Sequence, residues 1–124
     1  MIRGIGSDIL QISRIEAALE RTAGLERRIL TAPELTAFSD SSFPARFLAK
    51  RFAAKEAIVK ALGTGIGRGV SWQHIEIDKD QFGKPLVRLS EGAEQRAEQL
   101  EIRNIHLSYS DEKEYVIAFV VAEG

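Results

Sequence analysis

The sequence predicts an α+β protein in which N-terminal helices surround one long central helix that packs on a small, mainly antiparallel sheet. Helical patterns fill the first half of the chain, and alternating strand patterns dominate the second half. The helical run at residues 45–62 has no internal Gly or Pro. At 124 residues, 44% of them hydrophobic, the chain has the size and composition of a single globular domain, residues 1–124.

The first half should contain a short strand and several helices. The expected elements are a strand at residues 1–5 and helices at residues 11–22, 25–30, 31–39 and 45–62. Asp8 or Ser13 is a candidate cap of the first helix. Thr31, followed by a proline and by Glu34 three residues on, has the form of a helix start. The long helix is apolar nearly all round, so it should run through the middle of the protein.

The second half should supply the sheet. The expected elements are strands at residues 72–78 and 86–89, a helix at residues 91–100, and a hairpin of strands at residues 104–110 and 115–121. Ser90 is placed to cap the helix. The segment 63–69 has four glycines, yet it matches neither the dinucleotide fingerprint nor the phosphate-binding P-loop. It therefore fits a helix stop and a connection.

The composition excludes several kinds of site. The chain has no cysteine, which excludes disulfides, thiolate metal ligands and a cysteine nucleophile. It has only two histidines, so a bound metal would be held by carboxylates, which favours a hard cation. No apolar run approaches the length of a membrane span, and residues 1–10 lack the apolar segment of a secretory signal. We therefore expect a cytoplasmic protein without membrane partners.

Positive charge gathers on the long helix. The cluster consists of Arg46, Lys50, Arg51, Lys55 and Lys60, with Glu56 the only acid among them. Such a cluster suits phosphates or an acidic protein partner, although a solvated helix face is the simpler interpretation. The sequence pI of about 6.1 argues against nucleic acid as a partner.

Two carboxylates are candidate metal ligands. Glu56 lies at the edge of an apolar stripe, where a carboxylate needs a cation. Lys60, one turn further on, could supply it as an ion pair, and a bound divalent metal is the alternative. Asp8 is either a cap or turn aspartate, or a functional carboxylate on tight backbone with a glycine nearby, which would allow a bound group to approach closely. Together the two acids fit Mg²⁺, although spacing alone does not show that they meet.

Two further residues have open interpretations. Lys84, between Gly83 and Pro85, is by default a turn lysine. His106 should face away from its neighbours Ile105 and Leu107 on a strand, together with Ser108 and Ser110. The imidazole is then either a donor to phosphate or a packed, satisfied side chain.

The motifs together resemble those of the 4′-phosphopantetheinyl transferases, most closely their small bacterial type, the holo-[acyl-carrier-protein] synthases. The resemblance covers essentially the whole chain in order. It is carried by Ile5-Gly-Ser-Asp-Ile9, Phe52-Ala-Ala-Lys-Glu-Ala-Ile-Val-Lys60, Arg14, Arg28-Ile-Leu-Thr-Ala-Pro-Glu-Leu35, Gly63-Thr-Gly-Ile-Gly67, Ile75-Glu-Ile77, Gly83-Lys-Pro85 and the strand pair from His106 to Tyr115. The fold implied is that of the transferase family.

The resemblance implies an enzyme of fatty acid biosynthesis. It would move 4′-phosphopantetheine from coenzyme A to a serine of apo acyl carrier protein, with Mg²⁺ as cofactor and adenosine 3′,5′-bisphosphate as the product released. Homotrimers with sites between subunits are expected. The implied catalytic residues are Asp8, Glu56 and Lys60, the implied metal ligands are Asp8 and Glu56, the implied coenzyme A contacts are Arg46, Arg51, Lys60, Gly63, Lys84, Pro85 and His106, and the implied carrier contacts are Arg14 and Arg21.

One position departs from some relatives, which carry histidine where this chain has Asp111. A role of that histidine does not transfer to this chain. Two other functions remain open from the residues alone. One is a module that binds nucleotide or carrier without turnover, and the other is a structural trimer subunit.

Overall fold

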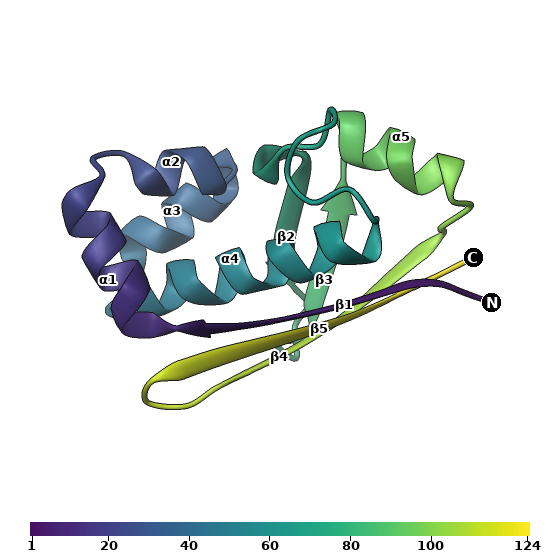
Figure 1. Ribbon diagram of the computed structural model, residues 1–124. Helices are drawn as coiled ribbons and strands as arrows, with labels where there is room; N and C mark the ends of the chain where they lie inside the picture. Colours follow the sequence, from purple (N-terminus) through teal and green to yellow (C-terminus); the bar gives the residue numbers. More distant parts are fainter.

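The computed structural model describes all 124 residues and has the expected α+β architecture. A long helix, α4 (Pro44–Ala61), lies between a three-stranded sheet on one side and the remaining helices on the other (Figure 1). The expected central helix on a small antiparallel sheet is thereby confirmed.

Helices dominate the first half of the chain, and strands dominate the second half. In chain order the other elements are β1 (Ile2–Gln11), α1 (Ile12–Arg21), α2 (Leu25–Ile29), α3 (Ala32–Asp40), the 3₁₀ turn η1 (Trp72–His74), β2 (Ile75–Lys79), β3 (Pro85–Leu89), α5 (Glu91–Gln99), β4 (Asn104–Asp111) and β5 (Tyr115–Glu123). None of the helices combines the length and the hydrophobicity that crossing a membrane requires.

Both sheets are antiparallel. The large sheet has the order β1-β5-β4, and β2 pairs with β3 in a separate two-stranded sheet. Asp8 of β1 lies opposite Ala118 of β5, which in turn lies opposite Tyr109 of β4. Because side chains alternate along a strand, these three residues share the sheet face that packs on α4.

Two glycines of β1 allow α4 to approach the sheet closely. A Cβ atom at Gly4 would overlap the backbone carbonyl oxygen of Ala61, and a Cβ at Gly6 would overlap that of Ala57. The sequence suggested that glycine beside Asp8 admits a ligand. The structure corrects this, because the space at Gly4 and Gly6 is filled by the α4 backbone.

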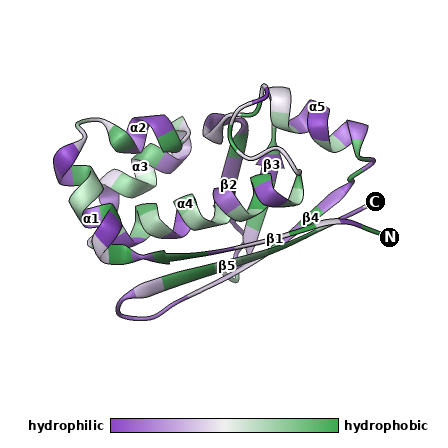
Figure 2. Ribbon diagram, viewed as in Figure 1, coloured by the Kyte–Doolittle hydropathy of each residue, from purple (hydrophilic) through white to green (hydrophobic).

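The helix α4 is buried along most of its length, as its all-round apolar pattern predicts. Small residues such as Ala49, Ala53 and Ala57 have no exposed surface, which is what permits close packing against the strands. In Figure 2, hydrophobic residues extend along β1 and β5, whereas α5 is mostly hydrophilic. The core of the protein therefore lies around α4.

Some expected starts and caps of elements were wrong. The first strand continues to Gln11, so Asp8 lies inside β1 rather than at a strand exit, and neither Asp8 nor Ser13 caps α1. The reason is tertiary, because β5 supplies pairing partners along β1 as far as Gln11. Ser90 stands at the N-terminus of α5, but its hydroxyl donates to the His74 carbonyl instead of capping the helix.

Candidate active site

Asp8 and Glu56 come together between β1 and α4. Asp8 projects from the helix-facing side of β1, and Glu56 lies on the adjacent face of α4; both are half-buried. Burial raises the pKa of Glu56, and the negative charge of Asp8 raises it further. The two carboxylates are therefore close enough to repel one another, although 47 residues lie between them in the sequence.

Lys60 forms its ion pair with Asp8 rather than with Glu56. Its ammonium Nζ donates to the Ser7 carbonyl oxygen at 2.8 Å and lies 3.3 Å from Oδ1 of Asp8. The ion pair of Lys60 with Glu56, which the sequence left open, is not formed. Glu56 thus has no cation within ion-pair distance, and the half-exposed Lys60 ammonium stands beside the carboxylate pair.

Trp72 lies beside the Asp8–Glu56 pair, and the sequence analysis did not identify it as a residue of the candidate site. Its indole packs against Phe52 with ring centroids 5.9 Å apart. The indole N–H lies near Glu56 and lowers the pKa of that carboxyl against the larger effect of burial, yet Nε1 makes no hydrogen bond of normal geometry. Trp72 is the single tryptophan of the chain, but no spacing pattern links it to Glu56.

The carboxylate pair has the donor chemistry for a hard divalent cation. The protein contains no group of three or more His, Cys, Asp or Glu side chains placed to hold a metal. Mg²⁺, however, is commonly held by one or two carboxylates, with waters and substrate phosphates as its other ligands. Two half-buried carboxylates that repel one another fit this requirement.

The basic residues of α4 differ in burial and in the groups that they contact. Lys55 is fully buried and Arg51 nearly so, which makes the interpretation as a solvated helix face wrong for these two residues. The Arg51 guanidinium donates to the Tyr109 hydroxyl at 3.1 Å and lies over the Phe47 ring at 4.7 Å. A hollow of about 150 Å³ beside it is also lined by Lys50, among other residues.

Arg46 joins α4 to the turn between β4 and β5. Its guanidinium lies 2.7 Å from Oδ2 of Asp111 and donates to the backbone carbonyls of Glu112 and Lys113. The hydrogen bond from Arg46 is the main reason that the pKa of Asp111 falls below its usual value, and the charge of Lys50, 3.6 Å away, lowers it further. Asp111 therefore neutralises part of the basic cluster in this chain.

Three proposed coenzyme A contacts lie elsewhere. His106 sits on the face of the large sheet opposite to Asp8, is exposed, and places Nε2 2.7 Å from Oε1 of Glu123. It is thus not a packed imidazole. Lys84 and Pro85 belong to the β2–β3 hairpin, where the Lys84 side chain is exposed. One chain therefore does not bring His106 to the Asp8–Glu56 pair.

The remaining predicted residues occupy accessible positions. Gly63 follows the end of α4 with a positive φ of 75°, which suits a helix stop. Arg14 and Arg21 are exposed on α1, the helix that directly follows β1. Neither Asp8 nor Glu56 lines any of five hollows on the surface of the protein.

Solved structures similar to this one share its fold over nearly the whole chain. The crystal structure of a holo-[acyl-carrier-protein] synthase from Neisseria meningitidis superposes with a TM-score of 0.94 at 44% identity, covering 100% of both chains. A holo-(acyl-carrier-protein) synthase from Bacillus anthracis, described as a complex with CoA (3′,5′-ADP), matches with a TM-score of 0.82 at 41% identity and covers 98% of this chain and 96% of that one.

Curated relatives give the same family. The holo-[acyl-carrier-protein] synthase of Shewanella frigidimarina is 57% identical over 124 residues, covering 99% of this chain and 98% of the relative. That of Vibrio cholerae is 54% identical, with the same coverage of both chains. The family model of the 4′-phosphopantetheinyl transferase superfamily matches residues 4–120. The chain belongs to the 4′-phosphopantetheinyl transferase superfamily.

Proposed function

We propose that this chain is a holo-[acyl-carrier-protein] synthase of fatty acid biosynthesis. It transfers 4′-phosphopantetheine from coenzyme A to a serine of apo acyl carrier protein and releases adenosine 3′,5′-bisphosphate. The identity of more than half to curated synthases over nearly the full chain supports this activity. The single structural observation that carries it is the meeting of Asp8 and Glu56 beside the Lys60 ammonium.

Asp8 and Glu56 would hold Mg²⁺, and the ion when bound would supply positive charge to the pyrophosphate of coenzyme A. Lys60 adds a second positive charge at the same place, because its ammonium is already oriented by Asp8 and by the Ser7 carbonyl. Phosphoryl-type transfer depends mainly on positioning and charge neutralisation. The nucleophile is the serine of the carrier, so the chain needs no nucleophile of its own.

The serine must lose a proton during transfer. A carboxylate of the Asp8–Glu56 pair is the candidate acceptor in this chain. Burial and the Asp8 charge raise the pKa of Glu56 while no metal is bound. A water ordered by the metal remains the alternative acceptor. The proton balance is complete in either case, because the serine oxygen forms the new bond to phosphorus and the bisphosphate leaves.

Coenzyme A would lie between subunits. Arg46, Arg51 and Lys60 of α4, and Gly63 just after it, would line one side of the site. Lys84, Pro85 and His106 would come from the β2–β3 hairpin and the opposite sheet face. Because Asp8 and His106 lie on opposite faces of one sheet, contact of both with one coenzyme A requires a second copy of the chain.

A homotrimer is the assembly that we propose. The outer face of the large sheet exposes a row of apolar side chains, including Ile5, Ile9, Ile117 and Phe119. A protein of this size rarely leaves such a row in water, so the face is suited to a second copy. The acidic acyl carrier protein would dock on α1 through Arg14 and Arg21, by charge complementarity.

Two expectations from the sequence stay predictions. We propose that residues 1–124 form a single domain, which the single buried cluster around α4 supports. A cytoplasmic location remains an expectation.

Mass spectrometry of apo acyl carrier protein tests the proposed activity. The carrier is incubated with this protein, coenzyme A and Mg²⁺, and the expected result is a mass gain equal to the phosphopantetheine arm. Omission of coenzyme A is the control. A carrier of unchanged mass, with coenzyme A nevertheless bound to the protein in calorimetry, would contradict the transferase and indicate a binding module instead.

A further inference from the structure

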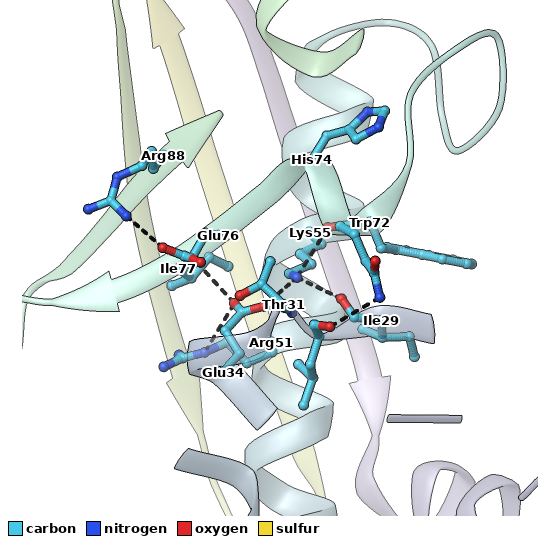
Figure 3. A network of polar contacts seen from close by, with 12 residues as sticks. Ile29, Thr31, Glu34, Arg51, Lys55, Trp72, His74, Glu76, Ile77 and Arg88 are labelled. Atoms are coloured by element: carbon cyan, nitrogen blue, oxygen red, sulfur yellow. Dashed lines mark hydrogen bonds and ion pairs between the residues drawn. The ribbon is translucent and has the colours of Figure 1, made fainter. Parts of the chain in front are cut away.

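The carboxylate of Glu34, on α3, contacts α4 and β2 in one buried network (Figure 3). The sequence identified Glu34 only as the acid at the start of α3, and in that place its Oε1 accepts from the Thr31 backbone N–H at 2.8 Å, whereas the Thr31 hydroxyl makes no hydrogen bond. Oε1 of Glu34 also lies 2.6 Å from Nζ of Lys55. Only 2% of Glu34 and none of Lys55 is exposed. Burial of this kind is rare for either residue type.

Lys55 uses its three ammonium protons on three elements. Besides Glu34 on α3, Nζ donates to the Ile29 carbonyl oxygen on α2 at 2.7 Å. The third acceptor is the Trp72 carbonyl oxygen on η1, 3.2 Å away. An ammonium group has three donors and no acceptor, so its bonding capacity is filled. A small rotation of α4 would break these contacts together.

The second carboxylate oxygen of Glu34 contacts β2 and a second cation on α4. Oε2 accepts from the Ile77 backbone N–H at 3.0 Å and lies 3.7 Å from Nε of Arg51. This Nε atom makes no hydrogen bond. Arg51 is one helical turn before Lys55 on α4. A single carboxylate therefore fixes two cations on the helix that carries Glu56.

Stability alone does not account for this arrangement. A buried ion pair gains little net stability, because the loss of water around both charges offsets their attraction, and apolar residues of similar size often serve as well. What an ion pair adds is directional contact. Here the contacts end at the Trp72 backbone and at Arg51, and the Trp72 indole in turn lies near the Glu56 carboxyl.

We infer that Glu34, acting through Lys55, is a positioning residue of the transferase site. It fixes the rotation of α4 and the place of Trp72, so that Glu56 faces Asp8 and Arg51 faces the basic hollow beside Tyr109. The inference rests on the proposed function, and it concerns residues that make no contact with the reacting groups. An effect on coenzyme A and metal use should therefore accompany any displacement of Trp72.

The decisive variant neutralises both charges and retains their approximate volume. Glu34→Gln with Lys55→Met removes the directional ion pair without leaving the Lys55 ammonium buried alone, which the single Glu34→Gln change would do. In both variants Arg51, 3.7 Å from Glu34, loses its anion. Trp72 is the only tryptophan, so its fluorescence reports the position of the η1 segment directly. Leu107→Ala is the matched control, because it opens a cavity in the sheet core without touching the network.

The expected result has two parts. The double variant should show a shifted or differently quenched Trp72 emission while retaining the circular dichroism spectrum of the parent. Per folded molecule, its Michaelis constant for coenzyme A and its half-saturating Mg²⁺ concentration should rise, and its turnover should fall about ten-fold or more. Leu107→Ala should leave the Trp72 emission unchanged. Its Michaelis constant for coenzyme A and its half-saturating Mg²⁺ concentration should stay within about two-fold of the parent values, even if its melting temperature falls as much as that of the double variant.

Unchanged emission and unchanged constants in the double variant would overturn the inference. If the double variant does not fold, Glu34→Asp decides, because it retains the charge but withdraws the carboxylate by one methylene group. A positioning role predicts altered emission and a higher Michaelis constant for Glu34→Asp, and normal values for both would contradict it. A parent protein that transfers nothing would instead refute the proposed function, while the emission comparison still tests whether Glu34 places Trp72.

Discussion

Asp8 and Glu56 meet because of two local periodicities. Gly4, Gly6 and Asp8 follow one another on the same side of β1, so the glycines admit α4 and the next residue on that side is the acid. On α4, Glu56 stands one turn before Lys60, which reaches back to Asp8. Residues of ordinary type thus produce a carboxylate pair with one adjacent cation.

Removal of either carboxylate should abolish transfer. We expect Asp8→Asn and Glu56→Gln each to lower turnover at least about a hundred-fold, because each change removes negative charge from the proposed metal site. Both side chains are half-buried and each substitution is isosteric, so the fold should survive. The measurement is carrier modification by mass spectrometry, with circular dichroism as the control. Near-normal turnover in both variants would refute the metal assignment.

Glu56 should also make stability depend on pH. Because its pKa in the folded protein is raised above the usual 4.5, the folded state binds this proton more tightly than the unfolded state does. Ionisation therefore costs stability as the pH rises from 4.5 through the raised pKa. Without divalent metal, Glu56→Gln should match the parent below this window and be more stable above it, as measured by urea unfolding at several pH values. A parent that gains stability over the variant with rising pH would contradict this sign.

At the scale of elements, local patterns predicted the helices well. The helix start at Thr31 with Glu34 and the uninterrupted run of α4 are both encoded in adjacent residues, and both are found. The length of β1 was not predictable in this way. The run Gly6-Ser7-Asp8 is typical of a turn, and only pairing with β5 makes it strand.

The buried role of Lys55 was not predictable either. Lysine is almost always exposed, so its place in a basic run indicated a charged surface. The acid that pairs with it lies 21 positions earlier, on another helix, and was already explained as a cap. Sequence reasoning therefore identified the two carboxylates of the candidate site but not the network of Glu34 and Lys55.

The close contact between β1 and α4 gives a prediction for the pair of elements. Gly6→Ala would place a methyl group against the Ala57 carbonyl oxygen, which is backbone and cannot move aside. We expect a loss of about 1–3 kcal/mol in the free energy of unfolding, together with reduced transfer, since α4 must shift relative to Asp8. Chemical denaturation and the carrier assay measure the two effects. Ser108→Ala, on the outer face of β4, is the control, and a Gly6→Ala protein as stable as this control would contradict the packing argument.

At the scale of the whole molecule, one chain holds two halves of the proposed site on opposite faces of a sheet. Asp8 faces α4, and His106 faces outward beside an apolar surface where Ile117 is 50% and Phe119 47% exposed. A second copy that covers this surface would both bury the apolar row and bring its own Asp8 side toward His106. Closed symmetry then repeats the same site at each interface.

Subunit mixing tests whether the site is shared. Asp8→Asn and His106→Ala are each expected to be inactive or nearly so as separate proteins. If Asp8 of one subunit serves the same coenzyme A as His106 of its neighbour, trimers formed after mixed refolding contain intact sites at interfaces where each subunit offers its unaltered residue. Random association of equal amounts should restore about a quarter of the parental activity. A site built within one chain restores nothing, because every subunit then carries one damaged component. Phe119→Glu provides the matching control: by placing charge on the apolar face it should yield monomers in sedimentation, and it should prevent the recovery when introduced into both partners.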